Sequence, residues 1–170
     1  MTFWIQLFIL FLVGLMIYLI YPSFLGAVYV PTPMKRVRRM LEIAQVGPDD
    51  VVYDMGSGDG RIIITAAKEY GAKSVGLEAD PLRVLYTKWK IMRNNLGDKV
   101  DVFRANFFNV SMKDATVVTV YQGPEINLRL MKKFREELEP GTKVVSFFFV
   151  FEGYEPVEVD EKNQVYLYEV

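Results

Sequence analysis

The chain begins with an apolar stretch and then changes to a regular alternation of apolar runs and amphipathic segments. Residues 3–21, FWIQLFILFLVGLMIYLIY, contain only one strongly polar side chain, Gln6. At a rise of 1.5 Å per residue, roughly 20 residues cross about 30 Å of hydrocarbon. Trp4, Tyr18 and Tyr21 stand where aromatic side chains meet a membrane surface. The pattern therefore predicts a transmembrane helix.

Two other interpretations of this segment stay open. A cleaved signal peptide is disfavoured because the run is long, has no basic region before it and shows no small-residue cleavage site. A buried core helix is disfavoured because such helices are seldom apolar on every side. The first charges that follow are basic, and this bias predicts that the rest of the chain lies in the cytoplasm, with the N-terminus outside. These residues are Lys35, Arg36, Arg38 and Arg39.

Beyond the first segment, the spacing of apolar positions predicts helices that alternate with strands. A helix is expected over 33–45, with Thr32 as its N-cap and Pro33 in its first turn. Further strands are expected at 51–54, 74–78, 100–104, 117–121 and 143–151, and helices at 61–70, 81–95 and 124–138. Two last apolar runs flank the polar sequence DEKN and predict a hairpin of 157–159 with 164–169.

This alternation is typical of a parallel sheet with helices on both faces. We expect an α/β fold: a Rossmann-like, doubly wound, mostly parallel sheet with a C-terminal antiparallel hairpin, preceded by one transmembrane helix. The chain then divides into an anchor and linker, 1–28, and one domain, 29–170. In the helix over 81–95, the side chains expected to face inward are Leu82, Leu85, Tyr86, Trp89 and Met92.

Composition removes several kinds of chemistry. Cysteine and histidine are both absent from the 170 residues. A disulfide framework, a thiol nucleophile and an imidazole base are therefore excluded, and any proton transfer depends on a carboxylate, Tyr, Lys or water. The net charge of −1 gives no sign of a nucleic-acid surface. No constellation of metal ligands stands out, so neither a metal nor a nucleic-acid partner is expected.

The most informative stretch is VVYDMGSGDGR at 51–61. A glycine-rich turn after the first strand of an open α/β sheet is the usual ligand site, because glycine adopts positive φ and lets a ligand approach the backbone. A dinucleotide-binding turn needs Gly-x-Gly-x-x-Gly, but Arg61 occupies the third glycine position. A P-loop needs a Gly-Lys-Ser/Thr ending, which is missing. The loop instead reads Asp-x-Gly-x-Gly-x-Gly.

This loop resembles motif I of class I S-adenosylmethionine-dependent methyltransferases. The resemblance implies S-adenosylmethionine as cofactor. Glu78, about 20 residues after the glycines, stands where a carboxylate accepts the ribose hydroxyls; a bare surface Glu is the alternative. Asn106 replaces the acidic residue that often lies near the adenine amino group, and Phe107 would pack either on the adenine or in the core. The loop residues assigned to the cofactor are Asp54, Gly56, Ser57, Gly58, Asp59 and Gly60.

A narrower resemblance rests on three segments: YVPTP at 29–33, VVYDMGSGDGRI at 51–62 and VGLEADPL at 75–82. Together they are similar to seven-β-strand protein lysine methyltransferases, the group of archaeal lysine methyltransferases and the mitochondrial ATP synthase c-subunit lysine methyltransferase. In such a family the YVPTP segment would fold over the cofactor. That implies contacts from Tyr29 and Thr32, although the N-cap role is an equal alternative for Thr32.

The catalytic edge is less defined. YQGPE at 121–125 lacks the Asn/Asp-Pro-Pro-aromatic motif of many nucleobase and glutamine methyltransferases. A lysine amine must lose its proton before it attacks, and an apolar channel lowers its pKa. Tyr121, Tyr154 and the aromatic residues of 147–151 are candidates to line that channel, with a buried central strand as the alternative for each Phe. Glu125 would hold the amine or favour the helix N-terminus.

These observations favour a membrane-anchored methyltransferase that acts on lysine side chains of membrane-associated proteins. Its partners would be a protein with an exposed lysine and membrane lipid, the latter through 3–21. Two alternatives remain: a methyltransferase acting on a lipid or small molecule, and a non-catalytic S-adenosylmethionine-binding membrane protein. Asn106 and the unusual YQGPE sequence keep the last alternative open.

Overall fold

The computed structural model describes residues 2–24 and 29–170, and their side chains over 3–17 and 29–170. The chain separates into two compact units, Met1–Val30 and Pro31–Val170. We call the second unit the C-terminal domain. Residues 25–28 of the expected linker lie outside the described residues.

The N-terminal unit is built on one helix, α1 (Thr2–Phe24). Apart from Gln6, its described side chains carry no strongly polar group, and all of them are exposed, with Trp4 73% exposed and Phe11 64%. Within the described part of the chain, no helix meets the length and apolarity that a bilayer crossing requires. The transmembrane span expected over 3–21 is therefore unsupported. The side chains of Tyr18 and Tyr21, expected as interfacial aromatics, lie outside the described residues.

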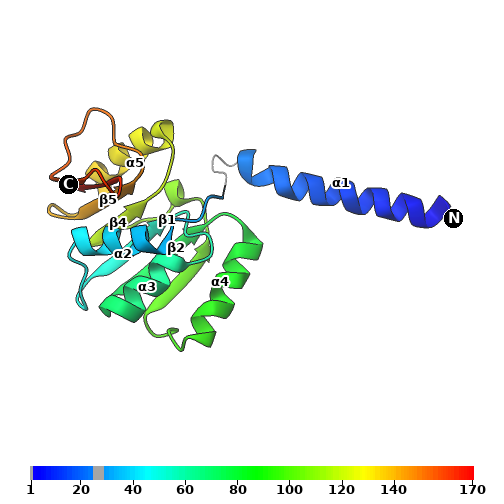
Figure 1. Cartoon of the computed structure of the whole chain (residues 1–170), viewed down its shortest axis with the longest axis horizontal. Helices are drawn as coiled ribbons and strands as arrows, with labels where there is room; N and C mark the ends of the chain where they lie inside the picture. The colour runs from blue at the N-terminus through cyan, green and yellow to red at the C-terminus, as the bar shows by residue number, and fades with distance from the viewer. Residues whose placement is uncertain (1, 25–28) are drawn as a thin grey trace. The chain divides into compact units, whose positions relative to one another are not determined.

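The C-terminal domain contains a seven-stranded sheet in the order β3-β2-β1-β4-β5-β7-β6 (Figure 1). β1 to β5 are parallel, and β7 is antiparallel to both β5 and β6. The strands are β1 (Val51–Met55), β2 (Lys73–Glu78), β3 (Val100–Arg104), β4 (Val117–Val120), β5 (Lys143–Phe147), β6 (Glu158–Asp160) and β7 (Val165–Glu169). The expected α/β fold with its closing hairpin is confirmed.

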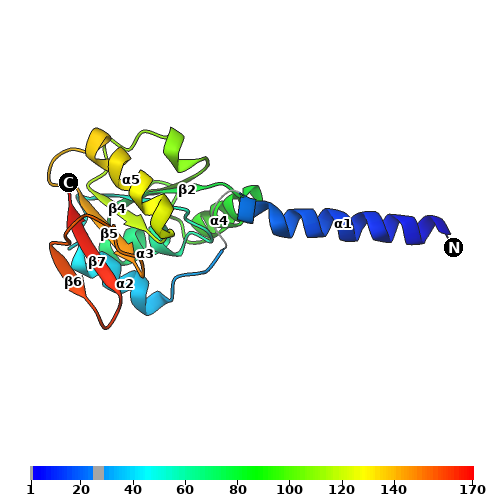
Figure 2. The same ribbon diagram turned by 90° about the horizontal axis from the view of Figure 1, so that it is seen from above.

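Helices cover both faces of this sheet (Figure 2). One face packs against α2 (Met34–Ile43), α3 (Arg61–Tyr70) and α4 (Pro81–Arg93). The other packs against α5 (Pro124–Glu137), beside the short 3-10 helix η1 (Phe107–Asn109). Within β1, Val52 belongs to the α2–α3 side and Tyr53 to the α5 side, as the two-residue period of a strand requires.

The structure overturns three details of the sequence prediction. The inner side of α4 is formed by Val84, Thr87 and Ile91, so the stripe expected to face the sheet points outward. Thr32 is not the N-cap of α2; Pro33 holds that position and no side chain caps the helix.

The fifth strand is also shorter than expected. β5 ends at Phe147 and not at 151, because Phe148 adopts a φ of 71°, which a strand does not allow. Phe151 then packs in the core between Phe134 and Tyr168.

Candidate active site

The glycine loop lies at the carboxyl end of β1, where the strand order reverses between β1 and β4. This is the switch point at which open α/β sheets bind ligands. Gly56, Gly58 and Gly60 all have positive φ, between 55° and 84°. A Cβ atom on Gly56 would lie 2.7 Å from Nε2 of Gln122, so a side chain would not fit without a shift.

The loop is fastened to the neighbouring strand. The backbone N–H groups of Gly56 and Ser57 both donate to the carbonyl of Leu77, at 2.9 and 3.1 Å. The Ser57 side chain lies over Gly76, where a Cβ would come within 2.6 Å of Oγ. The glycine inside β2 thus makes room for the loop.

Glu78, the last residue of β2, is 7% exposed and borders the loop. Its Oε2 accepts a hydrogen bond from the Gly58 N–H and its Oε1 one from the Asp80 N–H, both at 2.8 Å. Arg83 lies 3.8 Å away. These bonds hold the carboxylate rigidly at the strand end, the position expected for a ribose partner, and leave each oxygen a further lone pair.

Asp54 is the second carboxylate at this edge. It is 4% exposed, and its Oδ1 accepts a hydrogen bond from Oγ1 of Thr119 at 2.8 Å. The pKa of Asp54 is raised to about 7, mainly by burial; the Thr119 hydrogen bond lowers it, and the charges of Glu78 and Asp59 contribute to the rise. Two buried carboxylates beside the glycine loop suit a ligand that carries a positive charge and hydroxyl groups.

Unsatisfied polar atoms support the same conclusion. Among the described residues, buried side-chain atoms without a hydrogen-bond partner are found on only three residues: Oγ of Ser57, Oε1 of Gln122 and both amide atoms of Asn127. Such groups cost about 1–3 kcal/mol each and call for an explanation. Ser57 lies within the glycine loop, and Gln122 donates to the Met55 carbonyl directly before Gly56. A polar ligand at this edge would satisfy them, so the residues present fit S-adenosylmethionine.

Asp59 has a different setting from its neighbours in the loop. Its carboxylate binds Arg61 at 2.8 Å and Lys90 at 3.2 Å. Burial alone would raise the pKa of Asp59, but the Arg61 and Lys90 contacts outweigh it and hold the pKa below its usual value. Arg61 also donates from Nη1 to the carbonyl oxygen of Thr32 at 2.8 Å. The segment before α2 is thereby joined to the end of the glycine loop.

For the remaining predicted cofactor residues, the structure shows contacts with other protein groups and their exposure. Thr32 is 5% exposed beside Arg61, whereas Tyr29 belongs to the N-terminal unit. Asn106 is exposed, and its Oδ1 accepts a hydrogen bond from the Phe108 N–H, so the amide caps η1. Phe107 is half-buried, packs on Phe108 at 4.8 Å between ring centroids and contacts the α5-side core. Their cofactor contacts stay predictions.

An aromatic cluster occupies the same sheet edge at the ends of β4 and β5. Tyr121 follows β4 directly and lies 4.7 Å from Phe147 and 6.2 Å from Phe149, between ring centroids. Phe148 lies 4.9 Å from Phe149 and is 45% exposed. We call Tyr121 and Phe147–Phe149 the aromatic cluster. Because β4 lies beside β1, this cluster neighbours the glycine loop.

The three predicted catalytic residues, Tyr121, Glu125 and Tyr154, lie on different segments, and their catalytic roles stay predictions. Glu125 is exposed in the first turn of α5, near the end of β4. The Arg135 guanidinium lies over the Tyr154 ring, and Arg135 is in the last turn of α5, about 15 Å along the helix axis from Glu125. Tyr154 thus contacts a side chain from the last turn of α5, whereas Glu125 lies in its first turn.

Three polar residues at this edge were missed by the sequence prediction. Thr119 faces Asp54 in the β1–β4 register. Gln122 donates from Nε2 to the Met55 carbonyl at 2.9 Å, and Asn127 is fully buried on the inner side of α5. The available signal was polarity at positions whose period places them inward, namely Thr119 within an apolar strand and Asn127 in line with Leu130.

Comparison with known proteins agrees with this site. Residues 54–158 match the ANTKMT methyltransferase domain. A protein-lysine N-methyltransferase of Saccharolobus islandicus (strain REY15A) is 46% identical over 147 residues, 82% of this chain and 91% of the relative. The ATP synthase c-subunit lysine N-methyltransferase of Homo sapiens is 30% identical over 131 residues, 77% of this chain. The match covers 55% of the human protein, so the chain spans about half of its length.

A solved structure has the same architecture. The crystal structure titled RNA methyltransferase from Salinibacter ruber, in complex with S-adenosyl-L-homocysteine, superposes with a TM-score of 0.80 and 42% identity. The match covers 82% of this chain and 93% of that one. The chain therefore belongs to the ANTKMT methyltransferase family and is an S-adenosylmethionine-dependent methyltransferase of the class I, seven-strand fold.

Proposed function

We propose that this enzyme methylates lysine side chains of proteins. The observation that carries the proposal is the aromatic cluster, which lies beside the cofactor edge at the ends of β4 and β5. The relatives from Saccharolobus islandicus and Homo sapiens are both named as lysine N-methyltransferases, which supports the same substrate class.

The cofactor supplies an electrophilic methyl group on a sulfonium. Asp54 and Glu78 hold and orient the cofactor through its charged and hydroxyl groups, which fixes the direction of approach. The rings of Tyr121 and Phe148 form an apolar wall that disfavours the charged form of a lysine amine and so lowers its pKa. Aromatic faces also attract the methylammonium product. Glu125, at the start of α5, attracts the incoming amine and takes up its proton through water.

The openness of this edge favours a side chain that protrudes from a large substrate. Only η1 stands between β3 and β4, and residues 148–157 between β5 and β6 contain no helix. Enzymes that enclose small substrates place covering elements in such connections. A bare edge admits a lysine while the rest of its protein stays outside.

We further propose that the enzyme works on membrane-associated proteins, with α1 inserted in lipid and the C-terminal domain on the cytoplasmic side. Support comes from the exposed apolar surface of α1 and from the absence of charged side chains before Lys35. A relative that is named for a translocase also supports the proposal. This is the adenine nucleotide translocase lysine N-methyltransferase of Mus musculus, 31% identical over 152 residues, which is 88% of this chain and 66% of that protein.

Radiolabelled S-adenosylmethionine tests the substrate class. The purified chain is incubated with isolated membranes, and label is measured in protein, extracted lipid and RNA. Label in protein that yields methyllysine on hydrolysis is the expected result. An Asp54→Ala variant, which lacks the buried carboxylate, is the control. Equal labelling by both variants would contradict the proposal, as would label confined to lipid or RNA.

A further inference from the structure

The outward side of α4 is apolar, although it faces water in the C-terminal domain. Five large side chains are 46–68% exposed on it, and we call them the α4 stripe: Leu82, Leu85, Tyr86, Trp89 and Met92. Their spacing of three, four, seven and ten residues places them on one side of the helix. Tyr86 and Trp89 stack at 5.8 Å between ring centroids.

Folding of the domain does not account for this stripe. Val84 and Ile91 on the opposite side of α4 pack against α3 and β3 and complete the core there. Soluble monomers rarely expose contiguous apolar patches of this kind, and those that do usually bind something with them.

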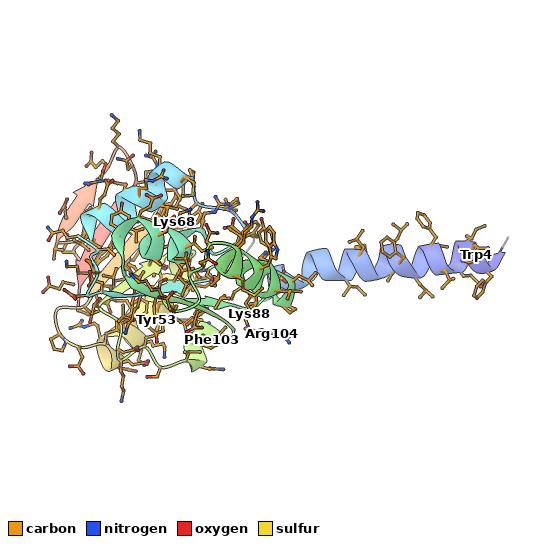
Figure 3. All side chains as sticks on the ribbon, turned by 90° about the horizontal axis from the view of Figure 1, so that it is seen from below. Trp4, Tyr53, Lys68, Lys88, Phe103 and Arg104 are labelled. Carbon is orange, nitrogen blue, oxygen red and sulfur yellow. The ribbon has the colours of Figure 1, made fainter. Side chains whose placement is uncertain are left out.

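The charges of α4 favour a negatively charged partner. The helix carries four basic residues and no acidic residue: Arg83, Lys88, Lys90 and Arg93. Lys90 turns inward to Asp59, and Arg83 lies near Asp80. Lys88 is exposed (labelled in Figure 3), and the Arg93 guanidinium lies 5.3 Å from the centre of the Trp89 ring. Neither of the latter two forms an ion pair with a carboxylate among the described residues.

Two basic residues of α2 differ in this respect. Arg38 pairs with Glu69 at 2.7 Å, and Arg39 with Asp160 at 2.5 Å. Their charge is already matched by acids of the same domain. Lys88 and Arg93 are thus basic groups without a carboxylate partner among the described residues, beside an exposed apolar surface.

We propose that the α4 stripe docks onto an anionic lipid surface, with its aromatic and aliphatic side chains in the headgroup region. Tyr and Trp with basic flanks are the composition of helices that lie in a membrane interface. α4 begins at Pro81, directly after the Glu78–Asp80 corner of the cofactor site. Docking through α4 therefore holds the catalytic edge close to the membrane surface, independently of α1.

Tryptophan fluorescence tests this contact without altering α4. The chain contains two tryptophans, Trp4 and Trp89, so Trp4→Phe leaves Trp89 as the only one. The full-length variant is reconstituted with vesicles of phosphatidylcholine alone or mixed with phosphatidylglycerol, each with or without brominated lipid. We expect Trp89 emission to shift to the blue and to be quenched by brominated lipid in the anionic vesicles, and less so at high salt.

The matched control moves the tryptophan to α5. Leu128 is 44% exposed on the other side of the sheet, so Trp4→Phe/Trp89→Phe/Leu128→Trp reports a surface that is not proposed to meet lipid. This probe is expected to stay accessible to aqueous iodide. The change Lys88→Glu with Arg93→Glu is expected to shift the docking equilibrium of Trp89 away from lipid, by about fivefold for each basic charge removed.

Two results would overturn the inference. One is that iodide quenches Trp89 fluorescence as strongly as that of the α5 probe, while brominated lipid leaves Trp89 fluorescence unchanged. The other is a blue shift of Trp89 without quenching by brominated lipid, which would assign the stripe to a second copy of the chain. Neither readout depends on methyl transfer, so failure here is distinct from failure of the lysine methyltransferase proposal.

Discussion

Oγ1 of Thr119 donates a hydrogen bond to Oδ1 of Asp54 at 2.8 Å, across the β1–β4 register at the centre of the sheet. This contact holds a carboxylate in a place from which water is excluded. Burial is the larger effect, and it raises the pKa of Asp54 to about 7 from an ordinary 3.8.

Asp54 therefore links stability to pH. Because its pKa is raised in the folded protein, its contribution is fully present below pH 3.8 and is lost as pH rises through 7. The cofactor-free protein should lose about 4 kcal/mol of unfolding free energy from this group between pH 4 and 8. Urea unfolding of the parent and of Asp54→Asn, over this pH range, measures the difference. The asparagine keeps an oxygen for Thr119 but does not titrate.

Binding of S-adenosylhomocysteine should show the opposite trend. On the proposed assignment of ionised Asp54 to the ammonium group of the ligand, affinity should rise as pH increases from 6 to 8, and Asp54→Asn should remove the rise. Isothermal titration calorimetry at each pH measures it. An unchanged pH profile in the variant would show that another group controls binding.

Arg61 should couple the glycine loop to the segment before α2. Arg61→Ala removes the bonds to Asp59 and to the Thr32 carbonyl, and we expect a loss of about 1 kcal/mol of unfolding free energy and about tenfold weaker S-adenosylhomocysteine binding. The comparison variant is Arg38→Ala, which breaks the exposed ion pair with Glu69. That change should alter stability little, because solvent screens an exposed ion pair, and should leave binding unaltered. Equal effects on binding would reject the coupling.

Asn127 should be worth more to activity than to stability. Both of its side-chain amide atoms are buried without partners, so Asn127→Leu, of similar size and apolar, should leave the unfolding free energy unchanged or raise it by about 1 kcal/mol. If the amide serves the reaction edge, the methyl-transfer rate should fall at least about tenfold. A variant that is as active as the parent would assign Asn127 no part in the reaction.

A change at Phe148 should likewise affect stability and substrate binding differently. Its φ of 71° favours glycine, and Phe148→Gly relieves about 1 kcal/mol of backbone strain against the loss of a half-exposed ring. Stability should change little, whereas KM for a lysine substrate should rise because the aromatic cluster loses one ring. Thermal unfolding and steady-state kinetics measure the two effects. Tyr121→Leu, which keeps an apolar side chain, should affect KM less.

The sequence by itself determined the sheet, the cofactor and most element boundaries. Alternation of apolar strands with helices is a local property of the sequence. The spacing of Asp54, Gly56, Gly58 and Gly60 likewise indicates a loop in which the lack of side chains lets a ligand approach the backbone. Local periodicity could not tell which side of α4 faces the sheet, because both of its sides carry apolar residues. The tertiary structure decided this by packing Val84 and Ile91 against β3.

Only the tertiary structure decided which groups share the reaction edge. Thr119 and Gln122 reach the glycine loop because β4 pairs with β1, a contact between residues about 65 positions apart. β5 ends at Phe147 because Phe148 has a positive φ, which the apolar run at 143–151 does not reveal. Short-range patterns specify helices, strands and turns, whereas the meeting of distant side chains depends on how those elements pack.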